Sequence, residues 1–212
     1  MEVVRNFGPE NDFLKKVRDL ANREKIVLIF DECTSGFRET FGGLHLKYNL
    51  YPDLAMFGKA LGNGHAINAI IGKREVMEHA KSCFISSTNW TERIGPVAAL
   101  ATLDEMEKTK SWKKITQFGN YFRHKLQTEI SHRNLTVKFS GLKSLTVSEI
   151  GSDLIAPDDI QIFRTLLTKR LLERGYLGTS LFYPSILHNK DEIERLDIKI
   201  GDEILKIGTE IN

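Results

Sequence analysis

The chain has 212 residues, of which 41% are hydrophobic and 27% charged, so it is long enough for one large globular domain or two small ones. Its 30 basic and 28 acidic residues leave a formal net charge of +2, and the basic residues are scattered along the chain. This balance argues against nucleic acid or an anionic membrane as a partner.

The first part of the chain is expected to interleave helices and short strands. Apolar residues at helical spacing predict a helix over residues 10–23. The apolar, β-branched run over 26–30 is typical of a strand buried on both faces, and further strands are predicted over 54–57 and 69–71. Interleaved segments of this kind indicate an α/β layered domain, in which ligands bind beyond the carboxyl ends of the strands.

From residue 92 onward, two long helices are followed by a change of composition. Helices are predicted over residues 92–110, 112–130, 158–174 and 190–207, and strands over 135–139, 144–148 and 177–182. Gly208 stands where the last helix is expected to end. The later segments indicate a small α+β domain, and the boundary is predicted near residue 110, which divides the chain into 1–110 and 111–212.

The cysteines, histidines and N-terminal residues exclude several classes of protein. Cys33 and Cys83 form no C-x-x-C pair, so we expect reduced thiols in a cytoplasmic protein. Residues 1–22 are polar and charged, which predicts no signal peptide, and no apolar stretch is long enough to span a bilayer. The histidines form no recognisable metal-ligand motif, so no metal site is predicted.

Two titratable residues closely follow predicted strands, Asp31 after 26–30 and Lys59 after 54–57. Each has an ordinary explanation, because such an aspartate is often a solvated strand end and such a lysine usually lies on the surface. Together they match the needs of pyridoxal-phosphate (PLP) chemistry, which uses an amine for a Schiff base and a carboxylate beside the pyridine nitrogen. Thr88 and Thr91 are candidate hydroxyls for the phosphate.

Three sequence segments carry a family resemblance. The run from Ile29 to Arg38 contains D-E-x-x-[ST]-G-F-R, and residues 52–64 contain P-D-[LI]-x-x-x-G-K-x-[LI]-G-x-G. A third segment, residues 86–96, ends in a Gly-Pro pair. In this order and spacing, the segments resemble the class-III aminotransferases, a family of fold-type I PLP enzymes. Within that family, the chain is most similar to the glutamate-1-semialdehyde aminomutases and their aminotransferase relatives.

The resemblance implies roles for individual residues. Lys59 would form the Schiff base with PLP, Asp31 would pair with the pyridine nitrogen, and Cys33 would contact the ring where the family often has valine. Thr91, with Thr88 as the second choice, would bind the phosphate of the neighbouring subunit's PLP. The resemblance therefore implies a homodimer that acts on a small amino-acid or amino-sugar substrate.

The resemblance also implies a fold and a reaction. The expected fold is part of the fold-type I large domain, with a mostly parallel sheet and helices, followed by a small α+β C-terminal domain. Family members are usually about twice as long, so the chain is expected to correspond to their C-terminal half. Amino-group transfer, by an aminotransferase or an aminomutase, is the leading expectation. The alternatives are decarboxylation or racemisation, or a non-catalytic fragment or subunit of a split enzyme that needs a separate N-terminal half.

Overall fold

The structure, a computed structural model, describes residues 7–85, 88, 91–132, 136–151, 155–178 and 181–211, with only the backbone described at residues 150 and 196–200. The chain divides into two compact units, Met1–Lys113 (unit 1) and Lys114–Asn212 (unit 2). The division falls close to the start of helix α4 (Ser111–His132).

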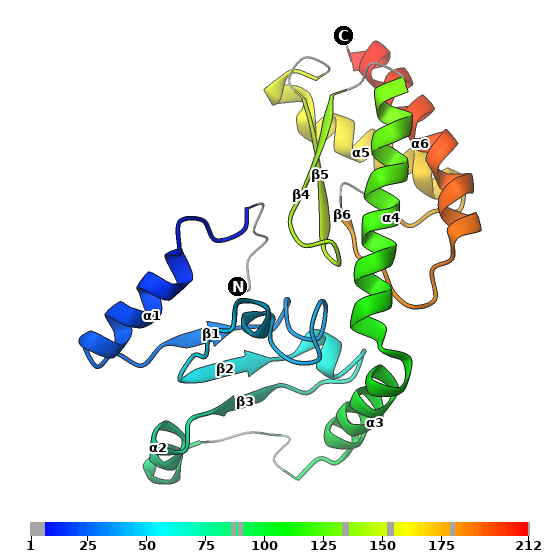
Figure 1. Cartoon of the computed structure of the whole chain (residues 1–212). Coiled ribbons are helices and arrows are strands. Elements are labelled where there is room, and N and C mark those ends of the chain that lie inside the picture. The colour runs from blue at the N-terminus through cyan, green and yellow to red at the C-terminus, as the bar shows by residue number, and fades with distance from the viewer. Residues whose placement is uncertain are drawn as a thin grey trace. The chain divides into compact units, whose positions relative to one another are not determined.

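A three-stranded sheet of order β1-β2-β3 organises unit 1 (Figure 1). Strand β1 (Ile29–Asp31) runs parallel to β2 (Leu54–Phe57), with Asp31 opposite Met56. Strand β3 (Ala69–Gly72) runs antiparallel to β2. The described part of the sheet therefore holds one parallel and one antiparallel pair, and the parallel pair brings two carboxyl ends to the same edge.

One face of the sheet is packed against helix α3 (Ile94–Thr109). Phe57 of β2 forms a buried cluster with Ala99 of α3 and with Leu61, which follows β2 in the chain. Burying a leucine or phenylalanine side chain contributes roughly 2 kcal/mol. The cluster therefore fixes the chain on both sides of Lys59.

The opposite face of the sheet is open. Side chains alternate between the two faces of a strand, so Ile29, Met56 and Ile70 point to the same side. They are 50%, 36% and 52% exposed, and together they are termed the open face. The prediction of a strand buried on both faces over 26–30 is therefore wrong. Phe30 is buried, but the described residues of unit 1 place no layer over Ile29.

Helices and turns frame the sheet of unit 1. Helix α1 (Phe13–Arg23) precedes β1, and α2 (Arg74–Met77) follows β3. Short 3-10 helices lie at Leu44–Tyr48, Lys59–Leu61 and Glu78–Ser82. The helix predicted from residue 10 begins later, at residue 13, because Asn11 and Asp12 adopt left-handed backbone conformations with φ of 52° and 56°.

A buried carboxylate, Asp53, ties α1 to the sheet. Its Oδ2 accepts hydrogen bonds from the Arg18 guanidinium at 2.9 Å and from the Leu28 N–H at 2.7 Å. Its Oδ1 lies 2.7 Å from the Lys73 ammonium. Burial by itself raises the pKa of Asp53, but the bonds from Lys73, Leu28 and Arg18 outweigh burial and hold that pKa at about 2. The carboxylate is therefore charged at neutral pH and links three segments of unit 1.

Unit 2 packs helices against an antiparallel sheet of order β4-β5-β6 (Figure 1). Besides α4, its elements are β4 (Val137–Ser140), β5 (Thr146–Ile150), α5 (Ile160–Glu173), β6 (Leu181–Phe182) and α6 (Lys190–Ile211), with a 3-10 turn at Pro157–Asp159. The core consists of apolar side chains from the helices and β4, including Phe122, Leu126, Ile130, Val137, Phe163, Leu167, Ile204 and Ile207. This is an α+β arrangement with a single continuous core.

Helix α6 continues through Gly208, so the prediction that Gly208 ends the last helix is wrong. A glycine inside a helix costs about 1 kcal/mol relative to alanine. Ile207 is fully buried in the core, and Ile211 packs against the same core. Because Ile211 lies beyond the glycine and packs against the core, tertiary packing offsets the cost of the glycine and carries the helix past residue 208.

Candidate active site

The carboxyl ends of β1 and β2 bring two predicted site residues to one edge of the sheet. Asp31 is the last residue of β1, and Lys59 lies just beyond the end of β2 at Phe57. The pairing continues past Asp31, because the Glu32 N–H donates a hydrogen bond to the Met56 carbonyl at 2.8 Å. Parallel pairing aligns the ends of neighbouring strands, which explains why residues far apart in sequence meet at this edge.

Asp31 is partly buried, and its carboxylate is held from one side. Its Oδ1 accepts a hydrogen bond from the Cys33 N–H at 3.0 Å, as an aspartate at the start of a turn commonly does. Within the described part of the chain, the Asp31 side chain makes no other hydrogen bond or ion pair. One carboxylate oxygen is therefore available to a donor from outside those residues.

Lys59 begins a 3-10 turn and has an exposed side chain. The turn is closed by the Leu61 N–H, which donates to the Gly58 carbonyl at 2.9 Å, and is anchored by the buried Leu61 side chain. Lys59 has a φ of 41°, in the left-handed region that non-glycine residues rarely adopt. Its ammonium donates a hydrogen bond to the Thr34 hydroxyl. Lys59 thereby reaches back to the loop that follows Asp31.

Gly58 allows two side chains to approach the backbone just before Lys59. A Cβ at position 58 would lie 2.3 Å from Asn68 Oδ1 and 2.8 Å from Cys33 Sγ, closer than a real Cβ contact. Glycine is therefore needed for both side chains to occupy these positions. The structure thus places Cys33 beside the peptide that carries Lys59, and adds Asn68 to the same cluster.

A buried carboxylate, Glu32, fixes the loop that contains Thr34. Its Oε2 accepts hydrogen bonds from the Ser35 hydroxyl at 2.5 Å and from the Leu44 N–H at 2.9 Å. Its Oε1 accepts a hydrogen bond from the His45 N–H at 3.0 Å and lies 3.0 Å from Nδ1 of the same histidine. These contacts satisfy a carboxylate that would otherwise be costly to bury. The loop over residues 32–45 is thereby held around Thr34.

Thr91 is exposed and lies in the turn before α3. Within the described residues, no hydrogen bond joins it to Asp31, Cys33 or Lys59, so the structure does not bring it into their cluster. Thr88 is also exposed, and residues 86, 87, 89 and 90 of the same segment lie outside the described residues. The expected contact of Thr91 with a neighbouring subunit's phosphate concerns a second chain and stays a prediction.

The start of α3 is fixed by Glu92 and Gly95. The Glu92 carboxylate accepts hydrogen bonds from the Gly95 N–H at 3.0 Å and the Ile94 N–H at 2.5 Å. These bonds stabilise the charged carboxylate and lower the pKa of Glu92 below its ordinary value. A Cβ at Gly95 would lie 2.8 Å from the Ala66 carbonyl oxygen, so the helix packs closely on the segment after the glycine-rich turn.

Sequence patterns do not predict three members of the site: Thr34, Asn68 and the supporting Glu32. Thr34 occupies a variable position of the first motif, and Asn68 lies outside all three motifs. Only Glu32 carries a signal, because it is the second residue of the D-E pair that begins with Asp31. The contacts of the other two become visible only when the strands are paired.

Among the residues that the structure describes, no three histidine, cysteine or acidic side chains are grouped so that they could hold a metal ion. No helix in the same part of the chain has the length and apolar character that crossing a bilayer requires.

Comparison with known proteins adds a family and a fold. The aminotransferase class-III family pattern matches residues 6–177. The chain is 37% identical over 134 residues to 3-aminobutyryl-CoA aminotransferase of Cloacimonas acidaminovorans. This match covers 63% of the chain and 32% of that protein. It is 35% identical over 150 residues to glutamate-1-semialdehyde 2,1-aminomutase 2 of Lachnoclostridium phytofermentans, which covers 68% of the chain and 35% of that protein.

A solved transaminase with PLP bound matches the structure with a TM-score of 0.85 and 21% sequence identity. The match covers 97% of the chain and 50% of the transaminase, so the chain spans about half the length of this neighbour. It likewise spans well under two thirds of the two curated relatives. The structural likeness confirms the predicted fold class, part of an α/β fold-type I PLP-transferase.

Proposed function

The chain belongs to the class-III aminotransferase family, and we propose that it takes part in PLP-dependent transfer of an amino group, with Lys59 as the residue that holds the cofactor. Aminotransferases and aminomutases of this family are PLP-dependent enzymes. One observation carries the assignment to residues. Asp31 and Lys59 lie at the carboxyl ends of two neighbouring parallel strands, and the Lys59 ammonium contacts Thr34 in the loop that follows Asp31.

The residues at this edge fit PLP by their chemistry. Lys59 offers a primary amine for the cofactor aldehyde. Asp31 offers a carboxylate oxygen that the described chain leaves unbonded, as a pyridine nitrogen would need. Gly58 clears the space in which Cys33 lies beside Lys59, and a small thiol suits contact with an aromatic ring. These features support a binding site for PLP.

Bound PLP supplies an electron sink that eases removal of a proton from the substrate carbon. Asp31 would accept a hydrogen bond from the pyridine nitrogen and, as a negative charge, favour its protonated form. The Lys59 amine would hold the cofactor until the substrate amine takes the place of the Lys59 amine on the cofactor. The freed amine would then carry a proton between the substrate carbon and the cofactor carbon, as general base and acid. Thr34 would give this amine a defined resting position.

We propose a small amino-acid or amino-sugar type of substrate. The two curated relatives are named for 3-aminobutyryl-CoA and for glutamate 1-semialdehyde. Aminotransferase and aminomutase activities would use Lys59 and Asp31 in the same way. They differ in whether the amino group leaves with a second substrate, so both reactions stay within the proposal.

The proposal extends to a homodimer in the cytoplasm, where thiols such as Cys33 and Cys83 stay reduced. The exposed Thr91 hydroxyl would bind the phosphate of the PLP held by the neighbouring subunit, most simply across a two-fold axis. Thr91→Ala is then expected to weaken PLP binding by the dimer more than Thr88→Ala does. An unchanged PLP affinity in Thr91→Ala would remove Thr91 from the site.

The test of the function is the visible spectrum of the chain with PLP, before and after borohydride reduction. We expect a reducible cofactor band, with the reduced label found on Lys59 by peptide mass spectrometry. Lys59→Ala should lose both the band and the label. Lys108→Ala, which removes an exposed lysine from α3, should keep both. A label that persists in Lys59→Ala, or that spreads evenly over the lysines, would contradict the assignment.

A second candidate is a non-catalytic fragment, or a subunit that needs a separate N-terminal half of the fold. The open face favours it, because Ile29, Met56 and Ile70 share a side of the sheet with Asp31 and no described layer covers them. Repeating the PLP titration with an added chain that supplies the rest of the fold distinguishes the cases. Labelling of Lys59 only in the presence of that chain indicates a split enzyme. Absence of labelling in both experiments indicates a non-catalytic remnant.

A further inference from the structure

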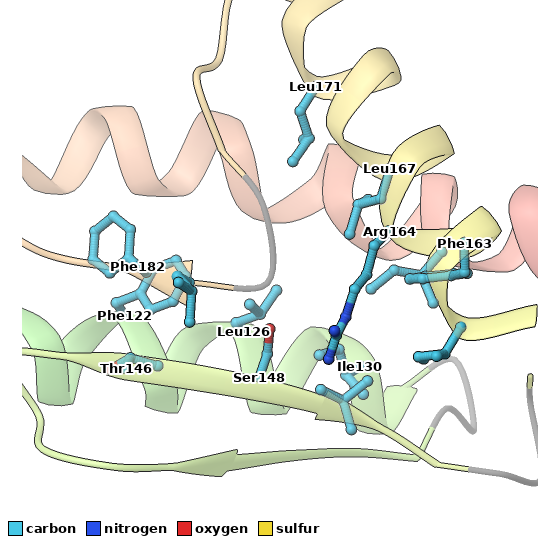
Figure 2. Close-up of a pocket in the computed structure, with 14 residues that line it drawn as sticks. Phe122, Leu126, Ile130, Thr146, Ser148, Phe163, Arg164, Leu167, Leu171 and Phe182 are labelled. Atoms are coloured by element: carbon cyan, nitrogen blue, oxygen red, sulfur yellow. The ribbon is translucent and has the colours of Figure 1, made fainter. Parts of the chain in front are cut away.

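Unit 2 contains a small cavity between α5, α4 and the β4-β5-β6 sheet, with a volume of about 50 Å³ (Figure 2). Its walls are mostly apolar and include Phe122, Leu126, Ile130, Phe163, Leu167 and Phe182. A cavity of about 10–15 Å³ is enough for one water molecule, and a dry cavity of about 150 Å³ can hold benzene. The cavity in unit 2 lies between these sizes, so it has room for a short hydrocarbon group.

One charged residue, Arg164, lines this cavity. It lies on the same stripe of α5 as Ile160, Leu167 and Leu171, which also line the cavity at helical spacing. The pattern of the helix calls for an apolar residue at this position. Figure 2 shows the Arg164 side chain pointing from α5 into the space between α5 and β5. The sequence therefore places a guanidinium at an otherwise apolar wall.

The Arg164 guanidinium has no hydrogen bond or ion pair with the part of the chain that the structure describes. It is exposed, so water and solutes can reach it. The polar residues that line the cavity from β5 are Thr146 and Ser148. No carboxylate lines the cavity among the described residues, so the guanidinium can take an anion from solution.

We propose that this cavity binds a small monocarboxylate with a short aliphatic tail. The carboxylate would accept parallel hydrogen bonds from the Arg164 guanidinium, whose planar fork matches the two carboxylate oxygens. The tail would fill the space between Phe122, Leu126 and Leu167. A dicarboxylate fits less well, because its second charge would meet an apolar wall without a partner. The cavity lies wholly within unit 2, whereas Lys59 lies in unit 1, so the inference does not rest on the proposed function.

The test is isothermal titration of the 212-residue chain with sodium butyrate, with butyramide, acetate and succinate as comparisons. We expect butyrate to bind with a dissociation constant on the order of millimolar, as suits a ligand of a few heavy atoms. Butyramide keeps the shape and lacks the charge, so it should bind about tenfold more weakly. Acetate and succinate should also bind more weakly, since one lacks the tail and the other carries a second charge.

Arg164→Gln should weaken butyrate binding by about tenfold, because it removes a charge-assisted bond. Lys169→Gln removes a positive charge from the same helix at an exposed position that does not line the cavity, and it should leave butyrate binding unchanged. Circular dichroism checks that both variants remain folded. The proposal is overturned if butyrate does not bind, if butyramide binds equally well, or if the two variants behave alike.

Discussion

The ammonium of Lys59 donates a hydrogen bond to the hydroxyl of Thr34, although 25 residues separate them in sequence. Thr34 is fixed by its own loop, in which the Arg38 Nε donates to the Thr34 carbonyl at 3.4 Å and the Glu32 carboxylate accepts hydrogen bonds from Ser35 and Leu44. The resting position of the amine is therefore set by the loop after β1, although Lys59 itself follows β2.

Thr34→Val keeps the shape of the side chain and removes the acceptor for Lys59. We expect the amine to lose its preferred position, so that labelling of Lys59 by PLP and borohydride falls by about threefold relative to Lys108, the effect of one hydrogen bond. Peptide mass spectrometry measures the ratio of the two labels. Thr109→Val, which alters a hydroxyl bonded within α3, serves as the control. An unchanged ratio in Thr34→Val would show that the contact does not position the amine.

Gly62 supports the turn that follows Lys59. Its N–H donates to the Lys59 carbonyl at 3.1 Å, and a Cβ at Gly62 would lie 2.2 Å from the His65 carbonyl oxygen. Because the obstructing atom belongs to the backbone, we expect Gly62→Ala to destabilise unit 1 by about 2 kcal/mol. Urea unfolding followed by tryptophan fluorescence measures this, since both tryptophans belong to unit 1.

The control for Gly62 is Gly8, where an added Cβ would meet nothing within 4 Å. Gly8→Ala is expected to change the free energy of unfolding by less than about 0.5 kcal/mol. Equal losses in the two variants would mean that the turn can relax around a side chain at position 62.

The types of most elements follow from the sequence because burial and periodicity agree along the chain. The strand predicted over 54–57 is β2, and the helix predicted over 112–130 lies within α4. The limits of elements are harder to predict, because they depend on contacts that a local pattern does not contain. The strand predicted over 26–30 is reduced to Ile29–Asp31, where it can pair with β2. The antiparallel direction of β3 is likewise a property of the pairing.

The site follows from the sequence only in part. Motif spacing indicates Asp31 and Lys59, because the chemistry needs a carboxylate and an amine at neighbouring strand ends. It does not indicate Thr34, which contacts the Lys59 ammonium, or Asn68, whose position depends on a close approach to the backbone at Gly58. Sequence patterns record which residues follow the strands, whereas the contacts among those residues arise when the strands pair.

Glu203 of α6 contacts three cations in unit 2, of which Arg170 and Arg174 join it to α5 and Lys206 lies on α6 itself. It is 2% exposed, with Oε2 at 3.1 Å from Arg170 and Oε1 at 2.6 Å from Arg174 and 3.4 Å from Lys206. Burial raises the pKa of Glu203, but these cations outweigh burial, and the net pKa is lowered. Glu203→Gln should therefore cost about 2 kcal/mol, because the cations would face a neutral amide.

Unfolding by urea, followed by circular dichroism, measures the cost of Glu203→Gln. Glu210→Gln is the matched control, because Glu210 also bonds Arg170 but is 53% exposed. An exposed pair of this kind contributes less than about 1 kcal/mol. Equal losses in the two variants would show that burial adds nothing to the cluster at Glu203.

The lowered pKa of Asp53 predicts that unit 1 loses stability in acid. Its pKa in the folded chain is about 2, against an ordinary value of 3.8, and the difference corresponds to about 2 kcal/mol. Because the folded pKa is the lower one, the contribution is fully present above about pH 4 and is lost as the pH falls through about 2. The stability of unit 1 should therefore fall across that window when unfolding is followed by tryptophan fluorescence.

Asp53→Asn should remove about 2 kcal/mol near neutral pH and less than about 0.5 kcal/mol near pH 2, because the wild-type carboxyl is then about half protonated in the folded chain and almost fully protonated in the unfolded chain. The difference between the two proteins should therefore shrink as the pH falls, whatever the other carboxylates contribute to both. Asp19→Asn, at an exposed position of α1, should track the wild type at every pH. The free energies of unfolding of the wild type and Asp53→Asn could instead differ by the same amount at every pH in the window. That result would mean that the charge on Asp53 does not contribute to its contacts with Arg18 and Lys73.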